Sequence, residues 1–335
     1  MAMTRKQFLL GAGAAGAAGL CAPRAYARRP VVIKLGYADH NNPITKNAAL
    51  AGQKIEAETK GRIKLEVFPS NELGNDEHML SGVRMGAIEM MAINDSILSG
   101  LVQASAIDAV GFAFKDAQTA WQALDGKVGE IVCAEIIKKG LYPMRCIWDE
   151  GFREVTTSAK PISDPADLKG LKIRVPPSPI LVSMFDHLSA AATTLNVSEL
   201  YSALETKVVD AQENPLSVIE SQKFYQVQKY CSLTNHAWSG FWLVAGGSFW
   251  QSLPADDRQI IEMAFNELAP KQRIESEALN QAMQSKLAGQ GMAFNSVDPA
   301  PFRAMLQASG FYAEWKQKFG AELWSALEDY TGPLA

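Results

Sequence analysis

Hydrophobic and polar residues in the first third of the chain form a repeating series of predicted strands and helices. Apolar runs at residues 31–37, 63–68 and 88–93 have the length of buried strands. The segments between them have helical patterns that end at Gly61 and Gly86, as glycine-terminated helices do. This β-α-β-α-β order predicts an α/β fold with parallel strands and helices packed on the sheet.

A second set of strands and helices follows and predicts a second sheet. The expected strands lie at 171–175, 191–194, 208–212 and 230–234, and the expected helices at 179–188, 197–204 and 215–224. A strand at 241–246 is expected to return to the first sheet. The helical pattern at 256–288 contains Pro270, which should kink the helix, and residues 299–330 are helical and amphipathic.

Two arginines occupy positions that packing alone does not explain. Arg174 lies in a strand whose opposite face carries Ile173 and Val175, and Pro176 ends that strand. Ligands of α/β sheets bind at the carboxyl ends of strands, where a guanidinium can form a two-pronged pair with a carboxylate. Arg153 follows an apolar and aromatic run. The alternative for such residues is an exposed or salt-bridged strand arginine.

Three segments resemble the signature segments of the DctP-like family, the substrate-binding proteins of tripartite ATP-independent periplasmic (TRAP) transporters. They read GFREVTTSAKPISDPADLKGLKIRVP, SELYSALETKVVDAQENP and FYQVQKYCSLTNH. The similarity runs from about residue 31 to near the C-terminus. It implies a two-domain α/β venus-flytrap protein, with a long helix spanning both domains, that captures an organic acid and delivers it to a membrane permease driven by an ion gradient.

The resemblance also implies a set of binding residues. By motif match, Arg174 is the carboxylate-binding arginine, Arg153 adds a second positive donor, and Asn214 adds an amide. Glu213 and His236 resemble members of a polar network near the hinge. The expected first domain comprises residues 28–150 plus 239–278, and the second comprises 151–238 plus 279–335. Hinges are expected near 148–151 and 239–241.

The N-terminus has the pattern of an export signal. Arg5 and Lys6 precede a short run of small apolar residues, and Ala25 and Ala27 supply a small-x-small cleavage pattern, so cleavage is expected after Ala27. The choice between Tat and Sec export stays open. The expected location is the periplasm, and the mature protein is expected to be a monomer. A length of 335 residues suits two domains, and a formal charge of −4 offers no surface for nucleic acid.

The sequence offers no pattern for catalysis, for a metal or for a cofactor. HExxH, GxSxG and P-loop motifs do not occur, and the histidines lack metal-ligand spacing. An enzyme would have to use carboxylates such as Glu150 and Glu213 as acid and base. A sensor domain is a third possibility, and a binding protein is favoured over both. Cys133, Cys146 and Cys231 form no disulfide framework, although a bridge between two of them stays open.

The remaining polar residues suggest the kind of acid that binds. The candidates in the first domain and at the crossing are His40, Asn41, Glu72, Asp76, Asn94 and Glu150. Amides and acids suit hydroxyl groups and would repel a second carboxylate. Trp238 could stack on a sugar ring or be core. A monocarboxylic sugar acid is therefore expected, a hexuronate such as glucuronate or galacturonate before an aldonate. A C4-dicarboxylate is the alternative. Asn94 stands where sialic-acid-binding relatives carry a glutamate, which argues against sialic acid.

Overall fold

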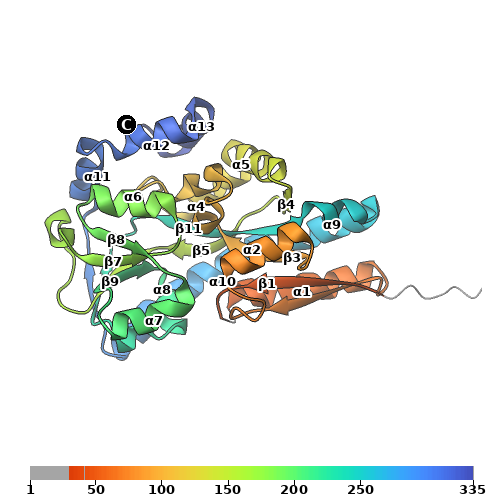
Figure 1. Cartoon of the computed structure of the whole chain (residues 1–335), viewed down its shortest axis with the longest axis horizontal. Coiled ribbons are helices and arrows are strands. Elements are labelled where there is room, and N and C mark those ends of the chain that lie inside the picture. The colour runs from red at the N-terminus through yellow and green to blue at the C-terminus, as the bar shows by residue number, and fades with distance from the viewer. Residues whose placement is uncertain (1–29, 41, 335) are drawn as a thin grey trace, which may run out of the picture.

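The computed structural model describes residues 30–40 and 42–334, so the predicted export signal and Asn41 lie outside the described residues. It contains two six-stranded sheets flanked by helices, which confirms the predicted α/β class (Figure 1). No helix in the part of the chain that is described is both long and apolar enough to cross a membrane. Cys133, Cys146 and Cys231 are free thiols.

The first sheet, called sheet A, has the strand order β2-β1-β3-β11-β4, with β5 also paired to β11. Its strands are β1 (Val31–Tyr37), β2 (Ile63–Phe68), β3 (Met90–Asn94), β4 (Leu141–Pro143), β5 (Trp148–Phe152) and β11 (Trp238–Gly246). Strands β2, β1 and β3 are parallel, and β11 is antiparallel to β3. The helices that accompany this sheet are α1 (Pro43–Glu58), α2 (Asp76–Met85), α3 (Asp95–Leu98), the 3-10 helix η1 (Gln103–Ala109), α4 (Ala117–Asp125), α5 (Lys127–Lys138) and α9 (Gly247–Ser252).

The second sheet, called sheet B, has the order β12-β10-β6-β9-β7-β8. Its strands are β6 (Glu154–Thr157), β7 (Lys172–Val175), β8 (Ala191–Thr194), β9 (Ala211–Asn214), β10 (Tyr230–Leu233) and β12 (Ala293–Ser296). Strand β7 is parallel to both β8 and β9. The helical segments of this part are η2 (Pro165–Leu168), α6 (Pro179–His187), α7 (Val197–Glu205), α8 (Leu216–Ser221) and η3 (Phe224–Gln226).

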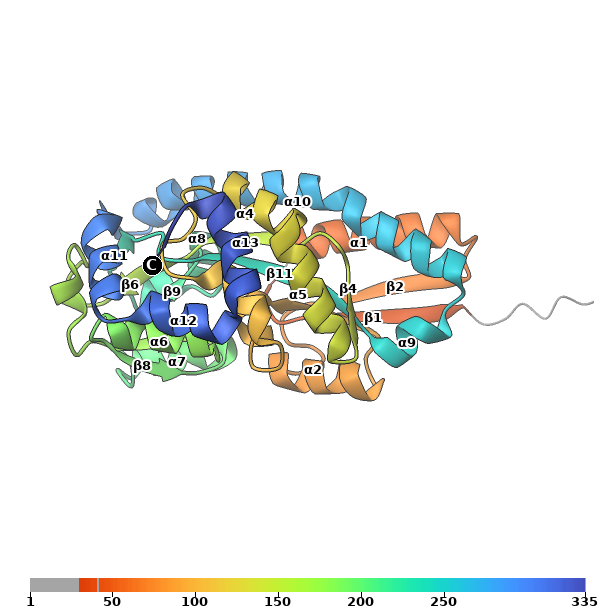
Figure 2. The same cartoon turned by 90° about the horizontal axis from the view of Figure 1, so that it is seen from above.

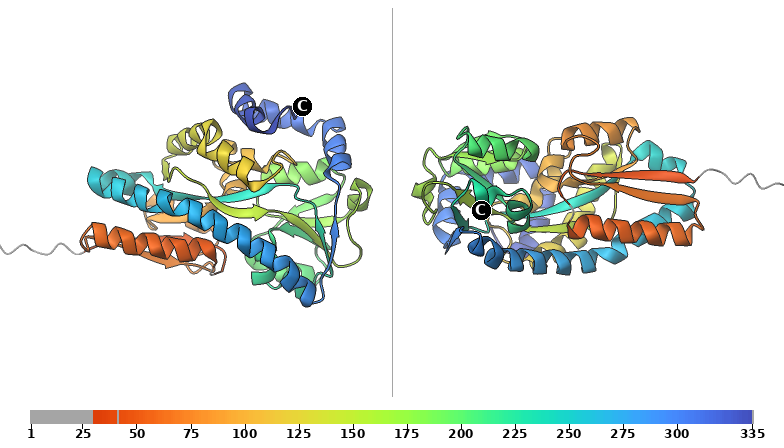
Figure 3. Two further views of the ribbon diagram at one scale, coloured as in Figure 1. Left: turned by 180° about the vertical axis from the view of Figure 1, so that it is seen from behind. Right: turned by 90° about the horizontal axis from the view of Figure 1, so that it is seen from below.

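The chain crosses between the sheets at Arg153, the single residue that separates β5 of sheet A from β6 of sheet B. It returns through residues 234–237, between β10 and β11. The helix α10 (Ala255–Gly289) contacts both α1 and α8, and Figures 2 and 3 show it running along both sheets. This confirms the long spanning helix. It is one element of 35 residues with Pro270 inside it.

The C-terminal segment, expected to be helical, forms α11 (Pro299–Ala308), α12 (Phe311–Phe319) and α13 (Ala321–Thr331). Helices α11 and α12 pack on α6 beside sheet B, whereas α13 packs on α4 and α5 beside sheet A. One hydrophobic core accordingly runs without a break from α5, through Trp324 and Trp315, to Phe185 of α6. The C-terminal helices thus connect the two halves on the face turned to the viewer in Figure 2, where α10 runs along the upper edge.

Two predicted strands, β9 and β11, differ most from the structure in where they begin. The strand expected at 208–212 begins at Ala211, because Lys207 adopts a left-handed φ of 61° and Val208 is 60% exposed in the preceding turn. The polar residues Gln212, Glu213 and Asn214 therefore lie inside a central strand, between β6 and β7. The strand expected at 241–246 begins at Trp238 and extends back to the crossing.

Side chains of α10 take the place of a neighbouring strand along one edge of β5. The Gln272 amide accepts a hydrogen bond from the Asp149 N–H at 2.8 Å and donates one to the Asp149 C=O at 2.8 Å. The Asn280 amide donates to the Glu150 C=O at 2.8 Å. These contacts satisfy buried backbone groups of β5 that would otherwise lack partners.

We expect Gln272→Leu to destabilise the fold by roughly 2–4 kcal/mol, because two buried backbone groups would lose their partner. Urea unfolding monitored by tryptophan fluorescence measures this change. Gln284→Leu is the control, an exposed glutamine of the same helix, and should change stability by less than about 0.5 kcal/mol. Equal effects of the two substitutions would contradict the role of Gln272.

Candidate functional site

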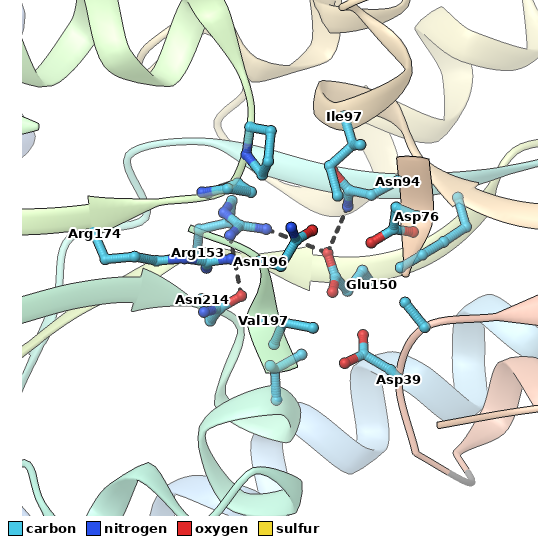
Figure 4. A pocket seen from close by; sticks show the side chains of 15 residues that line it. Asp39, Asp76, Asn94, Ile97, Glu150, Arg153, Arg174, Asn196, Val197 and Asn214 are labelled. Carbon is cyan, nitrogen blue, oxygen red and sulfur yellow. Dashed lines mark hydrogen bonds and ion pairs between the residues drawn. The ribbon is translucent and has the colours of Figure 1, made fainter. Parts of the chain in front are cut away.

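The carboxyl ends of strands from both sheets meet at one cleft. Sheet A contributes Asp39 after β1, Asp76 at the start of α2 and Asn94 at the end of β3, and sheet B contributes Arg174 in β7, Asn196 after β8 and Asn214 at the end of β9. Glu150 and Arg153 join them from the crossing. Figure 4 shows the two arginines and Asn214 on one side of this cleft and three carboxyl groups on the other.

Arg153 is buried and held by a full set of partners. Its Nε donates to Glu213 Oε2 at 2.5 Å, and its Nη2 donates to Glu213 Oε1 at 3.0 Å and to Asn214 Oδ1 at 3.1 Å. Burial alone would lower the pKa of the guanidinium, but the Glu213 carboxylate outweighs it and raises that pKa. Arg153 therefore remains charged, and its position is fixed before any ligand arrives.

Glu213 is fully buried behind Arg153 and also contacts His236 Nε2 at 3.1 Å. Burial would raise the pKa of this carboxyl, but the charge of Arg153 and the hydrogen bond of His236 outweigh it and lower the pKa to about 2. Burial lowers the pKa of His236. The imidazole Nδ1 lies 2.8 Å from Thr234 Oγ1. Glu213 and His236 thus support Arg153 from behind and do not line the cleft.

Arg174 is buried to 2% exposure, which excludes an exposed strand arginine. Its Nε and Nη2 both donate to the Leu195 C=O, at 2.8 and 2.6 Å. Burial lowers the pKa of its guanidinium to about 10, so the group is still charged at neutral pH. Unlike Arg153, it is neutralised by no direct carboxylate contact within the described residues. Its charge is available to an anion in the cleft.

The opposite side is an acidic wall, formed by Asp39, Asp76 and Glu150. Burial raises the pKa of Asp76 to about 7 and that of Glu150 to about 8. It also raises the pKa of Asp39, whose Oδ1 accepts a hydrogen bond from Gln222 Nε2 at 3.3 Å. Asp76 Oδ1 is buried and receives no hydrogen bond within the described residues. This wall can accept hydrogen bonds and, where protonated, donate them.

Amide groups lie on both sides of the cleft. Asn94 Nδ2 donates to Glu150 Oε2 at 3.0 Å and to Ser239 Oγ at 2.8 Å. Asn214 Nδ2 donates to Gln212 Oε1 at 2.5 Å. These bonds join Asn94 to the acidic wall and Asn214 to Gln212, another buried polar residue of β9.

Six of the predicted site residues line the cleft: Arg174, Arg153, Asn214, Asn94, Asp76 and Glu150. Five others do not, and two of these are Glu213 and His236, which lie behind Arg153. The remaining three lie elsewhere. His40 is exposed with Nδ1 2.9 Å from Ser70 Oγ, Glu72 is exposed, and Trp238 is buried with its indole donating to Asp149 Oδ2 at 3.0 Å. Asn41 lies outside the described residues. All contacts of these residues with a ligand stay predictions.

Sequence reasoning missed several lining residues. Asp39 directly precedes the predicted residues His40 and Asn41 and lines the cleft, although it is not among the predictions. Asn196 follows β8 directly, so its place at a strand's carboxyl end was a usable signal. The apolar members Ile97, Val218 and Phe241 carry no chemical signal, because similar residues fill every core. No group of potential metal-ligating side chains occurs among residues 30–40 and 42–334.

Comparison with known proteins agrees with this architecture. Residues 36–317 match the model of the DctP family, described as bacterial extracellular solute-binding protein, family 7. The chain belongs to this family. Its members are non-catalytic periplasmic solute-binding proteins of TRAP transporters, so the interpretation as a binding protein rather than an enzyme is confirmed.

Three similar proteins illustrate the family. The chain is 39% identical to the 2,3-diketo-L-gulonate-binding periplasmic protein YiaO of Escherichia coli over 65% of this chain and 66% of that one. It is 30% identical to the C4-dicarboxylate-binding periplasmic protein DctP of Rhodobacter capsulatus over 90% and 91% of the two chains. A TRAP solute-binding protein of Roseobacter denitrificans, solved with bound β-D-glucuronate, superposes with a TM-score of 0.85 at 26% identity, over 90% of this chain and 99% of that one.

We expect Glu213→Gln to cost roughly 3–5 kcal/mol of stability at pH 7, because it removes the bidentate counter-charge of buried Arg153 and leaves the longer contact with Glu150 at 3.4 Å. The lowered pKa of Glu213 means that its stabilising effect is present above the pKa of the unfolded chain, about 4.3. That effect is lost as the pH falls toward about 2. The difference in free energy of unfolding between the variant and the wild type should therefore become smaller as the pH falls over this range. Denaturant titrations measure it.

The matched control is Glu205→Gln, at an exposed glutamate of α7. Its stability should stay within about 0.5 kcal/mol of the wild type at each pH. A Glu213→Gln protein as stable as this control at pH 7 would show that the ion pair with Arg153 is not needed.

Proposed function

We propose that this protein binds an organic acid in the cleft, and that the acid is a monocarboxylic sugar acid, a hexuronate such as glucuronate or galacturonate before an aldonate. The observation that carries the proposal is the division of charge across the cleft. Arg174 offers one guanidinium that has no carboxylate partner among residues 30–40 and 42–334, and the acidic wall faces it from the other sheet. A molecule with one carboxylate and several hydroxyl groups matches both sides.

The acidic wall disfavours a second carboxylate at the far end of the ligand. Such a group would lie among Asp39, Asp76 and Glu150. The negative charges would repel each other unless some of the carboxyl groups bind protons. Hydroxyl groups can donate to these oxygens and to the unsatisfied Asp76 Oδ1. The glucuronate-bound structure and the diketogulonate-binding relative support a sugar acid. The DctP relative, named for C4-dicarboxylates, makes that class the second candidate.

Delivery and export complete the proposal. The family relationship supports a TRAP membrane permease as the partner that receives the ligand, and periplasmic relatives support export. Cleavage after Ala27 is proposed from the small-x-small pattern of the sequence. We propose that the two sheets mark two domains that close as a monomer, with hinges near 148–151 and 239–241, where β5 and β11 pair. The domain boundaries are proposed as 28–150 plus 239–278 and 151–238 plus 279–335.

A thermal-shift screen of the purified mature protein tests the ligand class. D-glucuronate, D-galacturonate or D-galactonate should raise the melting temperature in a concentration-dependent way, since a ligand that binds only the folded state stabilises it. Succinate and malate should raise it little. Strong stabilisation by the dicarboxylates and none by the sugar acids would overturn the proposed ligand.

We expect Arg174→Ala to weaken binding of the stabilising acid by about two to four decades, because removal of one partner of a buried ion pair costs roughly 3–5 kcal/mol. Arg174→Lys should also weaken binding, since an ammonium lacks the planar fork. Titration calorimetry measures both. The control, Lys172→Ala, removes an exposed cation of the same strand and should bind as the wild type does. Unchanged affinity in Arg174→Ala would remove Arg174 from the site.

A further inference from the structure

Four buried polar side chains, called the polar row, lead from the cleft into sheet B. Asn214 and Gln212 lie in β9, and Thr156 of β6 is the direct ladder partner of Gln212. Gln228, which precedes β10, completes the row. Each of the four residues is at most 4% exposed, and Asn214 is the member that lines the cleft. Buried polar groups are costly unless they are hydrogen-bonded, so their contacts decide what the row does.

The polar row is a continuous series of hydrogen bonds. Asn214 Nδ2 donates to Gln212 Oε1 at 2.5 Å, and Gln212 Nε2 donates to Thr156 Oγ1 at 2.8 Å. Thr156 Oγ1 in turn donates to Gln228 Oε1 at 3.2 Å. Every bond is therefore donated in the same direction, from the cleft toward the far end of the row.

Both ends of the polar row fix this direction. At the cleft, Asn214 Oδ1 lies 3.1 Å from Arg153 Nη2 (Figure 4), and a guanidinium nitrogen can only donate. At the far end, Gln228 Nε2 lies 3.1 Å from the Val227 C=O and 3.5 Å from the Asp210 C=O, which can only accept. Turning any one amide by 180° would therefore place two donors or two acceptors against each other.

We propose that Gln212, Thr156 and Gln228 are positioning residues that fix the orientation of the Asn214 amide, so that its second Nδ2 proton is presented to the acid in the cleft. One Nδ2 proton is donated to Gln212. Within residues 30–40 and 42–334 the other proton meets no acceptor, and Asn214 lines the cleft. The inference rests on the proposed function, since it concerns how the cleft holds its organic acid.

The orientation of Asn214 decides whether its amide attracts or repels an oxygen of the ligand. An amide N–H donates to a carboxylate or hydroxyl oxygen, whereas a turned amide would place its own oxygen against the ligand. Thr156 lies outside the cleft and is separated from Asn214 by Gln212. Loss of the Thr156 hydroxyl can therefore reach the ligand through the polar row.

The first measurement uses the ligand-free mature protein, so it does not depend on which acid binds. Thr156→Val removes the hydroxyl from the polar row, and Thr156→Ser keeps it. Thr157→Val is the matched control, because it removes a buried hydroxyl of the same strand that bonds the Lys160 C=O outside the row. In NMR spectra, the Asn214 Nδ2 protons should exchange with water at least about tenfold faster in Thr156→Val than in the wild type, and within about threefold of it in the other two variants.

Titration calorimetry with D-glucuronate supplies the functional readout. Thr156→Val should bind about fivefold to tenfold more weakly than the wild type, the worth of one hydrogen bond, whereas Thr156→Ser and Thr157→Val should stay within about twofold. Wild-type exchange or wild-type affinity in Thr156→Val would overturn the positioning role, and so would an equal loss in Thr157→Val.

Two further outcomes separate this inference from the proposed ligand and from a folding defect. If D-glucuronate does not bind the wild type, the proposed ligand fails, and the exchange of the Asn214 protons alone decides the role of the polar row. If Thr156→Val does not fold, Gln228→Met takes its place in both measurements, because it removes the acceptor of the Thr156 hydroxyl at the far end of the row.

Discussion

Two arginines must remain charged inside a boundary between two sheets, and the structure satisfies this requirement differently for each. Arg153 lies at the crossing of the chain and is neutralised by Glu213 in the neighbouring strand β9. Arg174 donates to the Leu195 C=O and pairs with no carboxylate in the described part of the chain. A buried ion pair is costly to break and a buried lone charge is costly to keep. An anionic ligand relieves the cost of the lone charge on Arg174, so most of the binding energy is expected there. Arg153, which is already paired, fixes the geometry of the site.

The folding pattern explains why opposite charges end up on opposite walls. The two sheets present the carboxyl ends of their parallel strands to the same space. Sheet A contributes acids and an amide to this space, and sheet B contributes a cation and amides. Asn280 of α10 bonds both the Glu150 C=O of β5 and the Ser217 N–H of α8, so α10 links the two sets of side chains. Recognition of both ends of a ligand therefore requires both sheets, which couples binding to the relative position of the two halves.

The β-α-β-α-β start of sheet A, four strands of sheet B and the long helix were predictable, because hydrophobic period and capping residues act locally. The short strands β4, β5, β6 and β12 were not predicted. The two arginines and Asn214 were found because they stand at strand ends within recognisable segments. Asp39 and Asn196 were missed because their neighbours looked equally polar, and His40 and Glu72 were chosen although they lie outside the cleft. Local patterns do not show which side chain of a loop turns inward. The hydrogen bond from the Gly240 N–H to Asp95 joins segments that are far apart in the sequence, which no local pattern predicts.

The most direct measurement is a crystal structure of the mature protein with the sugar acid that stabilises it most. The division of charge across the cleft predicts that the ligand carboxylate lies within about 3 Å of the Arg174 guanidinium, as charge-assisted hydrogen bonds do. The ligand hydroxyl groups should contact Asp76 and its neighbours on the acidic wall. A carboxylate bound among Asp39, Asp76 and Glu150, or a ligand that contacts only one of the two sheets, would contradict this account.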